Sequence, residues 1–275
     1  MSFQRAAFSP VKGGGGAVGR VIVTGAGGGI GAALARRFAA DGARVIVNDL
    51  DPAAAEAVAA EIGGLAVAGD AANEADVRRL VDTAWEELGG CDLFCANAGV
   101  LTAGSADASD AAWEKAWQVN VMSHVYVARA LLPRWLEGDG GRLLYTVSAA
   151  GLLTLLGSAP YSVTKHAALG FAEWLRATYA HRGITVQALC PQGVRTDMLT
   201  GGDDSASASR AQLAATALEP DDVASAVAKA LEGDSFLILP HPEVAEYYQR
   251  RATDPDRWLA GMNRIQRGFD AAGTA

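Results

Sequence analysis

The chain has 275 residues, of which 50% are hydrophobic and 20% charged, and its formal net charge is −8. This acidic balance argues against a nucleic-acid-binding surface, which requires clustered Lys and Arg, and the length fits one large α/β domain. Because the N-terminus lacks the apolar core of a signal peptide and no uninterrupted apolar run reaches membrane-spanning length, we expect a cytoplasmic protein.

Apolar, β-branched segments alternate along the chain with alanine-rich amphipathic segments. Continuous apolar character is typical of parallel strands that are covered on both faces, and repeated β-α-β units require right-handed crossovers. The sequence therefore predicts an α/β fold with a doubly wound parallel sheet of about seven strands and helices on both faces. The predicted strands cover 20–25, 43–49, 64–69, 91–99, 141–148, 183–193 and 235–240, and the predicted helices cover 30–42, 52–64, 74–90, 111–138 and 161–183.

The order of these segments predicts one domain with a short leader and a C-terminal extension. We expect residues 1–17, which include the GGGG run at 13–16, to be a flexible leader, and residues 18–240 to form the domain. Residues 241–275 extend beyond it and are expected to pack on the same domain or to form a subunit contact. Residues 200–212 are small and polar without periodicity, which is typical of a loop.

The sequence VIVTGAGGGIG at 21–31 follows the first predicted strand and opens the first predicted helix. Gly25 permits a tight turn, Gly29 allows the backbone to approach a pyrophosphate, and Gly31 allows the helix to pack closely. The N–H groups and the dipole at the start of the helix favour a phosphate. The GGGG run precedes the strand and lacks this context, so only the later turn predicts a nucleotide site.

Asp49 ends the second predicted strand, at the distance from the glycine turn where a carboxylate accepts hydrogen bonds from both ribose hydroxyls of an adenosine. Such a carboxylate repels a 2′-phosphate, which favours NAD over NADP. The alternative is that Asp49 only caps the helix that begins near Pro52, a role for which Asp51 is better placed.

Tyr161 and Lys165 stand four residues apart in YSVTK and so share one face of a predicted helix. A free tyrosine has a pKa of about 10, and a nearby ammonium favours the phenolate. The spacing therefore indicates that Tyr161 donates or accepts a proton.

The chain resembles the short-chain dehydrogenase/reductase family from roughly residue 18 to residue 240. The resemblance implies a Rossmann-type domain that binds NAD(H) or NADP(H) and transfers a hydride to or from a carbonyl or alcohol carbon. It rests on six separated features in the family's order and spacing, namely the glycine turn, Asp49, NAG at 97–99, Asn120, Ser148 and the pair Tyr161 and Lys165.

The resemblance also implies a catalytic set. Tyr161 would be the general acid/base that acts on the substrate oxygen, and Ser148 would orient that oxygen. Lys165 would hold the nicotinamide ribose and lower the pKa of Tyr161. Asn120 would support a water-linked proton relay to Lys165.

A cofactor site at the carboxyl ends of several strands is implied as well. Asp70 matches the family position that meets the adenine ring, and Asn97 either contacts the ligand or only stabilises the sheet. PQGVRT at 191–196 resembles the segment that contacts the nicotinamide, with Gln192 where the family usually has glycine. The implied cofactor-binding residues are Gly25, Gly29, Ile30, Gly31, Asp49, Asp70, Ala71, Asn97, Ala98, Gly99, Tyr161, Lys165, Pro191, Val194 and Thr196.

These residues favour an NAD(H)-dependent oxidoreductase that interconverts a secondary alcohol and a ketone. Two alternatives stay open, an NADPH-dependent biosynthetic ketoreductase and a non-catalytic NAD-binding sensor or scaffold, although a binding module has no need of the complete catalytic set. The leucines of AAGLLTLLGSAP at 149–160 either line an apolar pocket or pack their loop onto the protein. We therefore expect a hydrophobic small-molecule substrate.

The cysteines and histidines do not predict a metal site. Cys91, Cys95 and Cys190 are odd in number and far apart, which argues against a disulfide framework and favours buried thiols. The four histidines lack metal-ligand spacing, so we expect no bound metal.

The two longest predicted helices, 111–138 and 161–183, are apolar over more of their circumference than one sheet face requires. Excess apolar surface on a helix is typical of subunit contacts, and the resemblance implies that these helices pair between subunits. We therefore expect a homotetramer or, failing that, a dimer.

Overall fold

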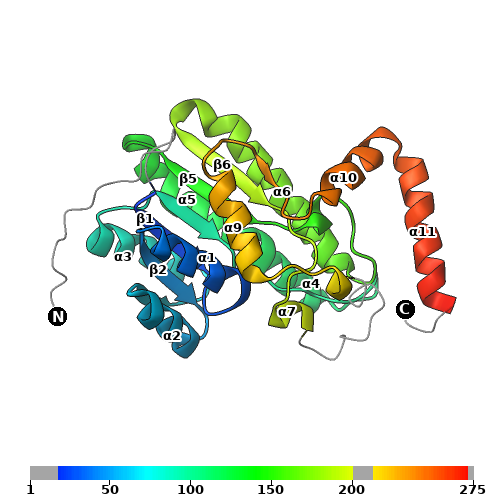
Figure 1. Cartoon of the computed structure of the whole chain (residues 1–275), viewed down its shortest axis with the longest axis horizontal. Helices are drawn as coiled ribbons and strands as arrows, with labels where there is room; N and C mark the ends of the chain where they lie inside the picture. Colours follow the sequence, from blue (N-terminus) through cyan, green and yellow to red (C-terminus); the bar gives the residue numbers. More distant parts are fainter. Residues whose placement is uncertain (1–17, 201–212, 272–275) are drawn as a thin grey trace.

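The computed structural model describes residues 18–200 and 213–271. Its seven strands form one parallel sheet in the order β3-β2-β1-β4-β5-β6-β7, with helices on both faces (Figure 1). This confirms the predicted doubly wound α/β fold. The predicted leader at 1–17 and nearly all of the predicted loop at 200–212 lie outside the described residues. The strands are β1 (Arg20–Thr24), β2 (Arg44–Asp49), β3 (Leu65–Ala68), β4 (Leu93–Ala96), β5 (Gly141–Thr146), β6 (Ile184–Leu189) and β7 (Leu237–Ile238).

Two helical layers cover the sheet. Helices α1, α2 and α9 contribute to one core, which includes Leu34, and α3, α5 and α6 contribute to the other, which includes Leu131. No helix of the described residues has the length and apolar character to span a membrane. The longer helices are α1 (Gly29–Ala40), α2 (Pro52–Ile62), α3 (Glu74–Thr83), α4 (Asp110–Trp117), α5 (Ser123–Glu137), α6 (Ala159–Tyr179), α9 (Pro220–Ala230), α10 (Glu243–Thr253) and α11 (Pro255–Ala271), and the short ones are η1 (Ala84–Leu88), η2 (Gln118–Met122), η3 (Ala149–Gly151), η4 (Ala180–Arg182) and α7 (Asp197–Thr200).

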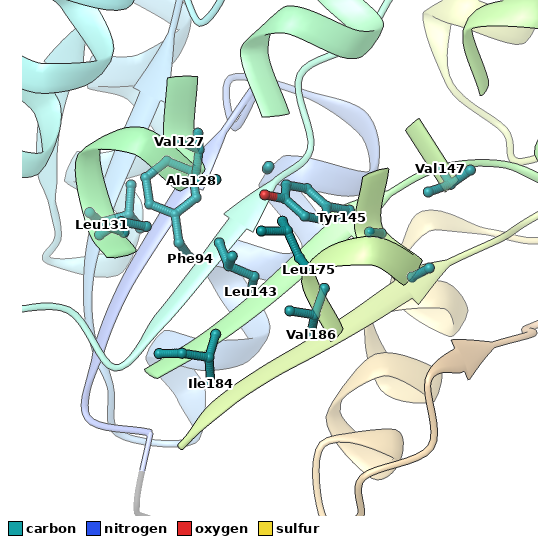
Figure 2. Packing of buried hydrophobic residues seen from close by; sticks show 14 of the residues in the cluster. Phe94, Val127, Ala128, Leu131, Leu143, Tyr145, Val147, Leu175, Ile184 and Val186 are labelled. Carbon is teal, nitrogen blue, oxygen red and sulfur yellow. The ribbon is translucent and has the colours of Figure 1, made fainter. Parts of the chain in front are cut away.

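The core beneath α5 and α6 is built from the inward residues of β4, β5 and β6. Figure 2 shows Phe94 and Leu143 of these strands beside Leu131 of α5, and all three are fully buried. Burying one such side chain contributes about 1.5–3 kcal/mol. Tyr145 is also fully buried, and its hydroxyl donates a hydrogen bond to the carbonyl of His124. The rings of Tyr145 and His124 are stacked, with their centroids 4.4 Å apart.

The strand order reverses next to β1. Val21 of β1 pairs with Val45 of β2 on one side and with Leu93 of β4 on the other. At such a switch point the loops after the strands diverge and leave a crevice at the carboxyl ends of the strands. The glycine turn that follows β1 and the segment that follows β4 both border this crevice.

The helix predicted at 111–138 is interrupted. Helix α4 ends at Trp117, the π-helical turn η2 carries Asn120, and α5 begins at Ser123. The apolar periodicity runs on through the interruption because a single wide turn shifts the buried face by only one residue, so the pattern alone does not reveal it.

The C-terminal helices differ in how they are attached. Helix α10 buries Val244 in the core, whereas α11 has no buried residue and packs mainly against α10. In Figure 1 α11 (red) extends beside the body of the molecule. The three cysteines are buried and unpaired, which confirms the expected thiols.

Candidate active site

The glycine turn after β1 is shaped by close backbone contacts. Gly25 and Gly29 adopt φ values of +59° and +51°, which side-chain-bearing residues rarely adopt. A Cβ atom at Gly31 would lie 2.1 Å from the carbonyl oxygen of Gly25. Gly25 and Gly29 are therefore required by the backbone conformation, and Gly31 is required by a close backbone contact.

Helix α1 begins directly after this turn and lacks a capping side chain. Its N-cap is Gly28, and its first turn has no acidic residue. By contrast, α2 is capped by Asp51 and α3 by Asn73. The first N–H groups of α1 therefore remain available to an anionic ligand, which is the arrangement that a pyrophosphate requires.

Asp49 lies at the end of β2, beside the glycine turn. Its carboxylate accepts hydrogen bonds from the N–H groups of Gly27, at 2.8 Å, and Asp51, at 3.0 Å. The N-cap of α2 is Asp51, which accepts from Ala53 at 2.9 Å. The alternative that Asp49 is the helix cap is therefore wrong, and its carboxylate faces the turn.

Asn97 joins three strands at the base of the crevice. Its amide donates to the carbonyl of Thr24 at 3.1 Å and accepts from the Thr146 hydroxyl at 3.0 Å. The Thr24 hydroxyl accepts from the N–H groups of Asn97 and Ala98. The sequence analysis missed both threonines, although a polar residue at the end of an apolar strand is a usable signal.

Asn120 is fully buried in the turn η2. Its side chain accepts from the N–H of Val100 at 2.9 Å and donates to the Val100 carbonyl at 3.0 Å and to Thr164 at 3.1 Å. A Cβ atom at Gly99 would lie 3.3 Å from Oδ1 of Asn120 and 3.4 Å from Nζ of Lys165. The structure thus brings the side chains of Asn120 and Lys165 close to the same glycine.

Tyr161 and Lys165 lie on α6, as the spacing predicts. The Lys165 ammonium is 5.5 Å from the centre of the Tyr161 ring and donates to the carbonyl of Thr146 at 3.0 Å. Ser148 follows β5, and its hydroxyl accepts from the N–H of Ala150 at 3.1 Å. The three side chains line one cleft.

Burial controls the protonation of this centre. It raises the pKa of Tyr161, an effect that the Ser148 hydroxyl partly offsets, and it lowers the pKa of Lys165 to about 8. The pKa of Tyr161 therefore departs in the opposite direction from the one expected from the ammonium alone. Loss of hydration is the largest cause of this shift.

The cleft has a volume of about 360 Å³ and runs from the glycine turn to Tyr161 and on to the segment after β6. Leu153 and Leu155 line it, whereas Leu152 is fully buried in the core, so the leucines of the 149–160 segment divide between pocket and packing. The predicted site residues in its wall are Gly29, Ile30, Asn97, Gly99, Ser148, Tyr161, Lys165, Pro191, Val194 and Thr196. The other predicted residues, Gly25, Gly31, Asp49, Asp70, Ala71, Ala98 and Asn120, do not line this cleft.

Gln192 does not distort the segment after β6. Its φ is not positive, so the backbone does not need the glycine that the family usually has there. The Gln192 N–H donates to Nδ1 of His241 at 3.2 Å, and His241 is 3% exposed. Burial lowers the pKa of His241, which keeps the imidazole neutral and able to accept this bond.

Arg251 of α10 connects the C-terminal segment to the segment that follows Ser148. Its guanidinium donates to the carbonyl of Leu152 at 2.7 Å and lies 3.4 Å from Nε2 of His166. Nδ1 of His166 lies 2.9 Å from the carbonyl of Ser162. If Nδ1 carries the proton, Nε2 accepts from the arginine, so a C-terminal residue contacts both the segment after Ser148 and the helix of Tyr161. Sequence reasoning missed this role.

Known proteins share these features. The family model described as short chain dehydrogenase matches residues 19–206. A 1-deoxy-11-beta-hydroxypentalenate dehydrogenase of Streptomyces exfoliatus is 38% identical over 231 residues, which cover 79% of this chain and 81% of that protein.

Solved structures agree with the sequence matches. A short-chain dehydrogenase/reductase from Burkholderia phymatum in complex with NAD has a TM-score of 0.79 at 26% identity, covering 86% of this chain and 94% of that one. A 7α-hydroxysteroid dehydrogenase complexed with NADH and 7-oxo glycochenodeoxycholic acid has a TM-score of 0.72 at 28% identity, covering 80% and 91%. On the strength of both comparisons, this chain belongs to the short-chain dehydrogenase/reductase family, oxidoreductases that act on hydroxyl and keto groups.

Proposed function

We propose that the protein is an NAD(H)-dependent oxidoreductase that interconverts a secondary alcohol and a ketone of a hydrophobic small molecule. The observation that carries this proposal is one cleft that holds Ser148, Tyr161 and Lys165 and also reaches the uncapped start of α1. The proton-transfer group Tyr161 can then act on a substrate bound next to a cofactor whose phosphates lie at the start of α1.

The side chains of the cleft divide the work on the substrate oxygen. The hydroxyls of Ser148 and Tyr161 bind that oxygen, and Tyr161 accepts its proton during oxidation and returns it during reduction. Lys165 and Tyr161 would hold the nicotinamide ribose, and Asn120 would support proton exchange through Lys165. The bound nicotinamide supplies the chemistry of hydride acceptance and donation.

Asp49 supports a preference for NAD. Its carboxylate lies beside the glycine turn and would repel a 2′-phosphate. The turn at 25–31 contains no Lys or Arg, and the residues after β2 are Leu50 and Asp51, so neither of these two segments supplies a cation for a 2′-phosphate. The neighbouring structures named above contain NAD or NADH, which agrees with this preference.

The substrate class is supported by the cleft wall and by the relatives. Leu153 and Leu155 present apolar surface close to Tyr161. The relatives' names identify a hydroxypentalenate and a 7α-hydroxysteroid as their alcohols. We therefore expect this chain to oxidise a carbinol on an apolar body.

The test is a steady-state screen of hydrophobic secondary alcohols with NAD and NADP in parallel, following the absorbance of the reduced cofactor. Turnover with NAD at a higher kcat/KM than with NADP supports the proposal. An equal or higher kcat/KM with NADP favours the ketoreductase alternative. Tight NAD binding without turnover on any alcohol or ketone favours a sensor or scaffold.

We also propose a homotetramer in the cytoplasm. Trp117 of α4 and Val163 and Trp174 of α6 are 42%, 49% and 53% exposed. Large apolar side chains on two neighbouring helices are typical of a subunit contact. Light scattering at micromolar protein and physiological salt should give a mass of four or two chains, and a monomer would contradict this part of the proposal.

A further inference from the structure

A second cleft opens beside the first and shares part of its wall. Its volume is about 1320 Å³, which leaves room for a ligand much larger than a simple alcohol. A molecule that reacts at Tyr161 can therefore extend along the shared wall into the second cleft. The residues that line both clefts are Leu153, Thr154, Leu155, Gln192 and Leu213.

The far wall of the second cleft is an apolar stripe on α11. Trp258, Met262, Ile265 and Phe269 recur at intervals of three or four residues and so lie on one side of the helix. The Trp258 ring lies 6.2 Å from that of Tyr247 on α10. The stripe and the shared leucines face one cleft from two sides, which is suited to an apolar body.

Two arginines interrupt this apolar surface. Arg257 and Arg264 line the cleft, and their seven-residue spacing places them on the same side of α11, about 10 Å apart along its axis. Within residues 18–200 and 213–271, neither guanidinium forms an ion pair. A third arginine of the cleft, Arg250, pairs with Glu246.

Two carboxylates, Asp254 and Glu243, are among the described residues that line the cleft, and neither forms an ion pair with Arg257 or Arg264. Asp254 accepts a hydrogen bond from the N–H of Arg257 at 3.0 Å and so caps the start of α11. Glu243 stands at the first position of α10, at the opposite end of that helix from α11. Among the described residues, three arginines and two carboxylates line this cleft, whereas the chain as a whole has a net charge of −8.

We propose that the second cleft binds the distal part of the substrate, and that this part is an apolar body that carries a carboxylate bound by Arg257 and Arg264. The guanidinium groups donate charge-assisted hydrogen bonds to the carboxylate, and the stripe on α11 covers the apolar body. The substrates are then hydrophobic hydroxy acids and the corresponding keto acids. This inference rests on the proposed function, since it assigns the end of the substrate that does not react.

Decanoate tests the site without turnover, because it is an apolar anion with no hydroxyl to oxidise. Calorimetric titration of the full chain should show saturable binding that weakens as salt screens the charges. The double variant Arg257→Gln/Arg264→Gln should raise the Kd for decanoate by about fivefold or more. Decyltrimethylammonium, which has the same tail and the opposite charge, should show no such loss.

The matched control is Arg267→Gln, because Arg267 lies on α11 and does not line the cleft. It should leave the Kd for decanoate unchanged. All of these side chains are exposed, so thermal unfolding should stay unchanged and report that each variant is folded. An unchanged Kd in the double variant, or no decanoate binding up to about 10 mM, would overturn the proposal.

A kinetic arm separates this inference from the proposed function. With NAD as cofactor, the double variant should raise the KM for 9-hydroxydecanoate relative to that for 2-decanol by about fivefold. If neither alcohol is oxidised but decanoate binding still depends on the arginines, the proposed function fails and the anion site stands. If 2-decanol is oxidised and decanoate binding ignores the arginines, the anion site fails and the proposed function stands.

Discussion

The catalytic centre and helix α11 border connected clefts, but the fold holds them in different ways. Tyr161, Lys165 and Asn120 are 9%, 3% and 0% exposed. Asn120 is hydrogen-bonded to Val100 and Lys165 to Thr146, both of which lie on other segments of the chain. Helix α11 has no buried residue, and its main partner is the neighbouring helix α10.

This difference separates two tasks that a dehydrogenase must perform. Hydride and proton transfer tolerate little displacement of the reacting groups, and the buried hydrogen bonds of the centre provide that precision. An exposed helix that lines a wide cleft can change its side chains with little cost in stability, because few contacts depend on them. Under the proposal for the second cleft, chemistry and substrate selection are therefore under separate structural control.

Removal of the Tyr161 hydroxyl is the strongest test of the buried catalytic centre. We expect Tyr161→Phe to lower kcat by about 10²- to 10⁴-fold, since it removes the only group that moves the substrate proton. NAD binding, measured by titration, should change little. Tyr179→Phe at the other end of α6 is the matched control and should keep its activity. A Tyr161→Phe enzyme that retains more than about a tenth of the turnover would show that another group moves the proton.

A substitution of Asp49 tests whether cofactor selection also depends on residues of the sheet and the glycine turn rather than on α11. Asp49→Ser should lower the ratio of kcat/KM with NAD to that with NADP by about tenfold or more, because the repulsion of the 2′-phosphate disappears. Asp51→Asn is the control, since asparagine keeps the cap of α2. An unchanged ratio in Asp49→Ser would place cofactor selection elsewhere in the site.

Burial of His124 makes the free energy of unfolding sensitive to acid. Burial lowers its pKa from 6.5 to about 3, so below pH 6.5 the unfolded chain binds a proton that the folded chain excludes. The free energy of unfolding should therefore fall by about 1.4 kcal/mol per pH unit below pH 6.5 from this group. His124→Leu should remove that slope in urea unfolding between pH 6.5 and about 4.5, and exposed His181→Leu should not. Equal slopes in all three proteins would contradict this assignment.

Deletion of α11 should have the smallest effect on stability. Removal of residues 255–275 should change the free energy of unfolding by less than about 2 kcal/mol, because α11 contributes no fully buried side chain. Urea unfolding measures the change. A larger loss would mean that α11 contributes to the stability of the domain core, and the contrast with the catalytic centre would no longer hold.

The features that depend on local spacing were predictable. Gly31 and Asp49 follow from the strand and helix on either side of them, and Tyr161 and Lys165 follow from helical periodicity. The seven strands follow from their continuous apolar character, and the structure confirms each of them within a few residues. In these cases the physical cause lies within a short window of the chain.

The features that depend on packing between distant segments were not predictable. His241 meets Gln192 across 49 positions, and Arg251 meets Leu152 across 99. Neither residue has a local signature, because the sequence does not distinguish a packed arginine or histidine from an exposed one. The rise in the pKa of Tyr161 was missed for the same reason, since it depends on how deeply the assembled fold buries the ring.

The burial of Lys165 also gives the protein a chemical handle. With a pKa of about 8, a large share of its amine is uncharged in mildly alkaline buffer, where a lysine in water, with a pKa of about 10.4, is almost entirely protonated. An uncharged amine is a nucleophile, and Lys165 lines the open cleft. A small aldehyde or acylating reagent that enters the cleft should therefore label this lysine, and the rate of labelling would report how much of the cleft is occupied.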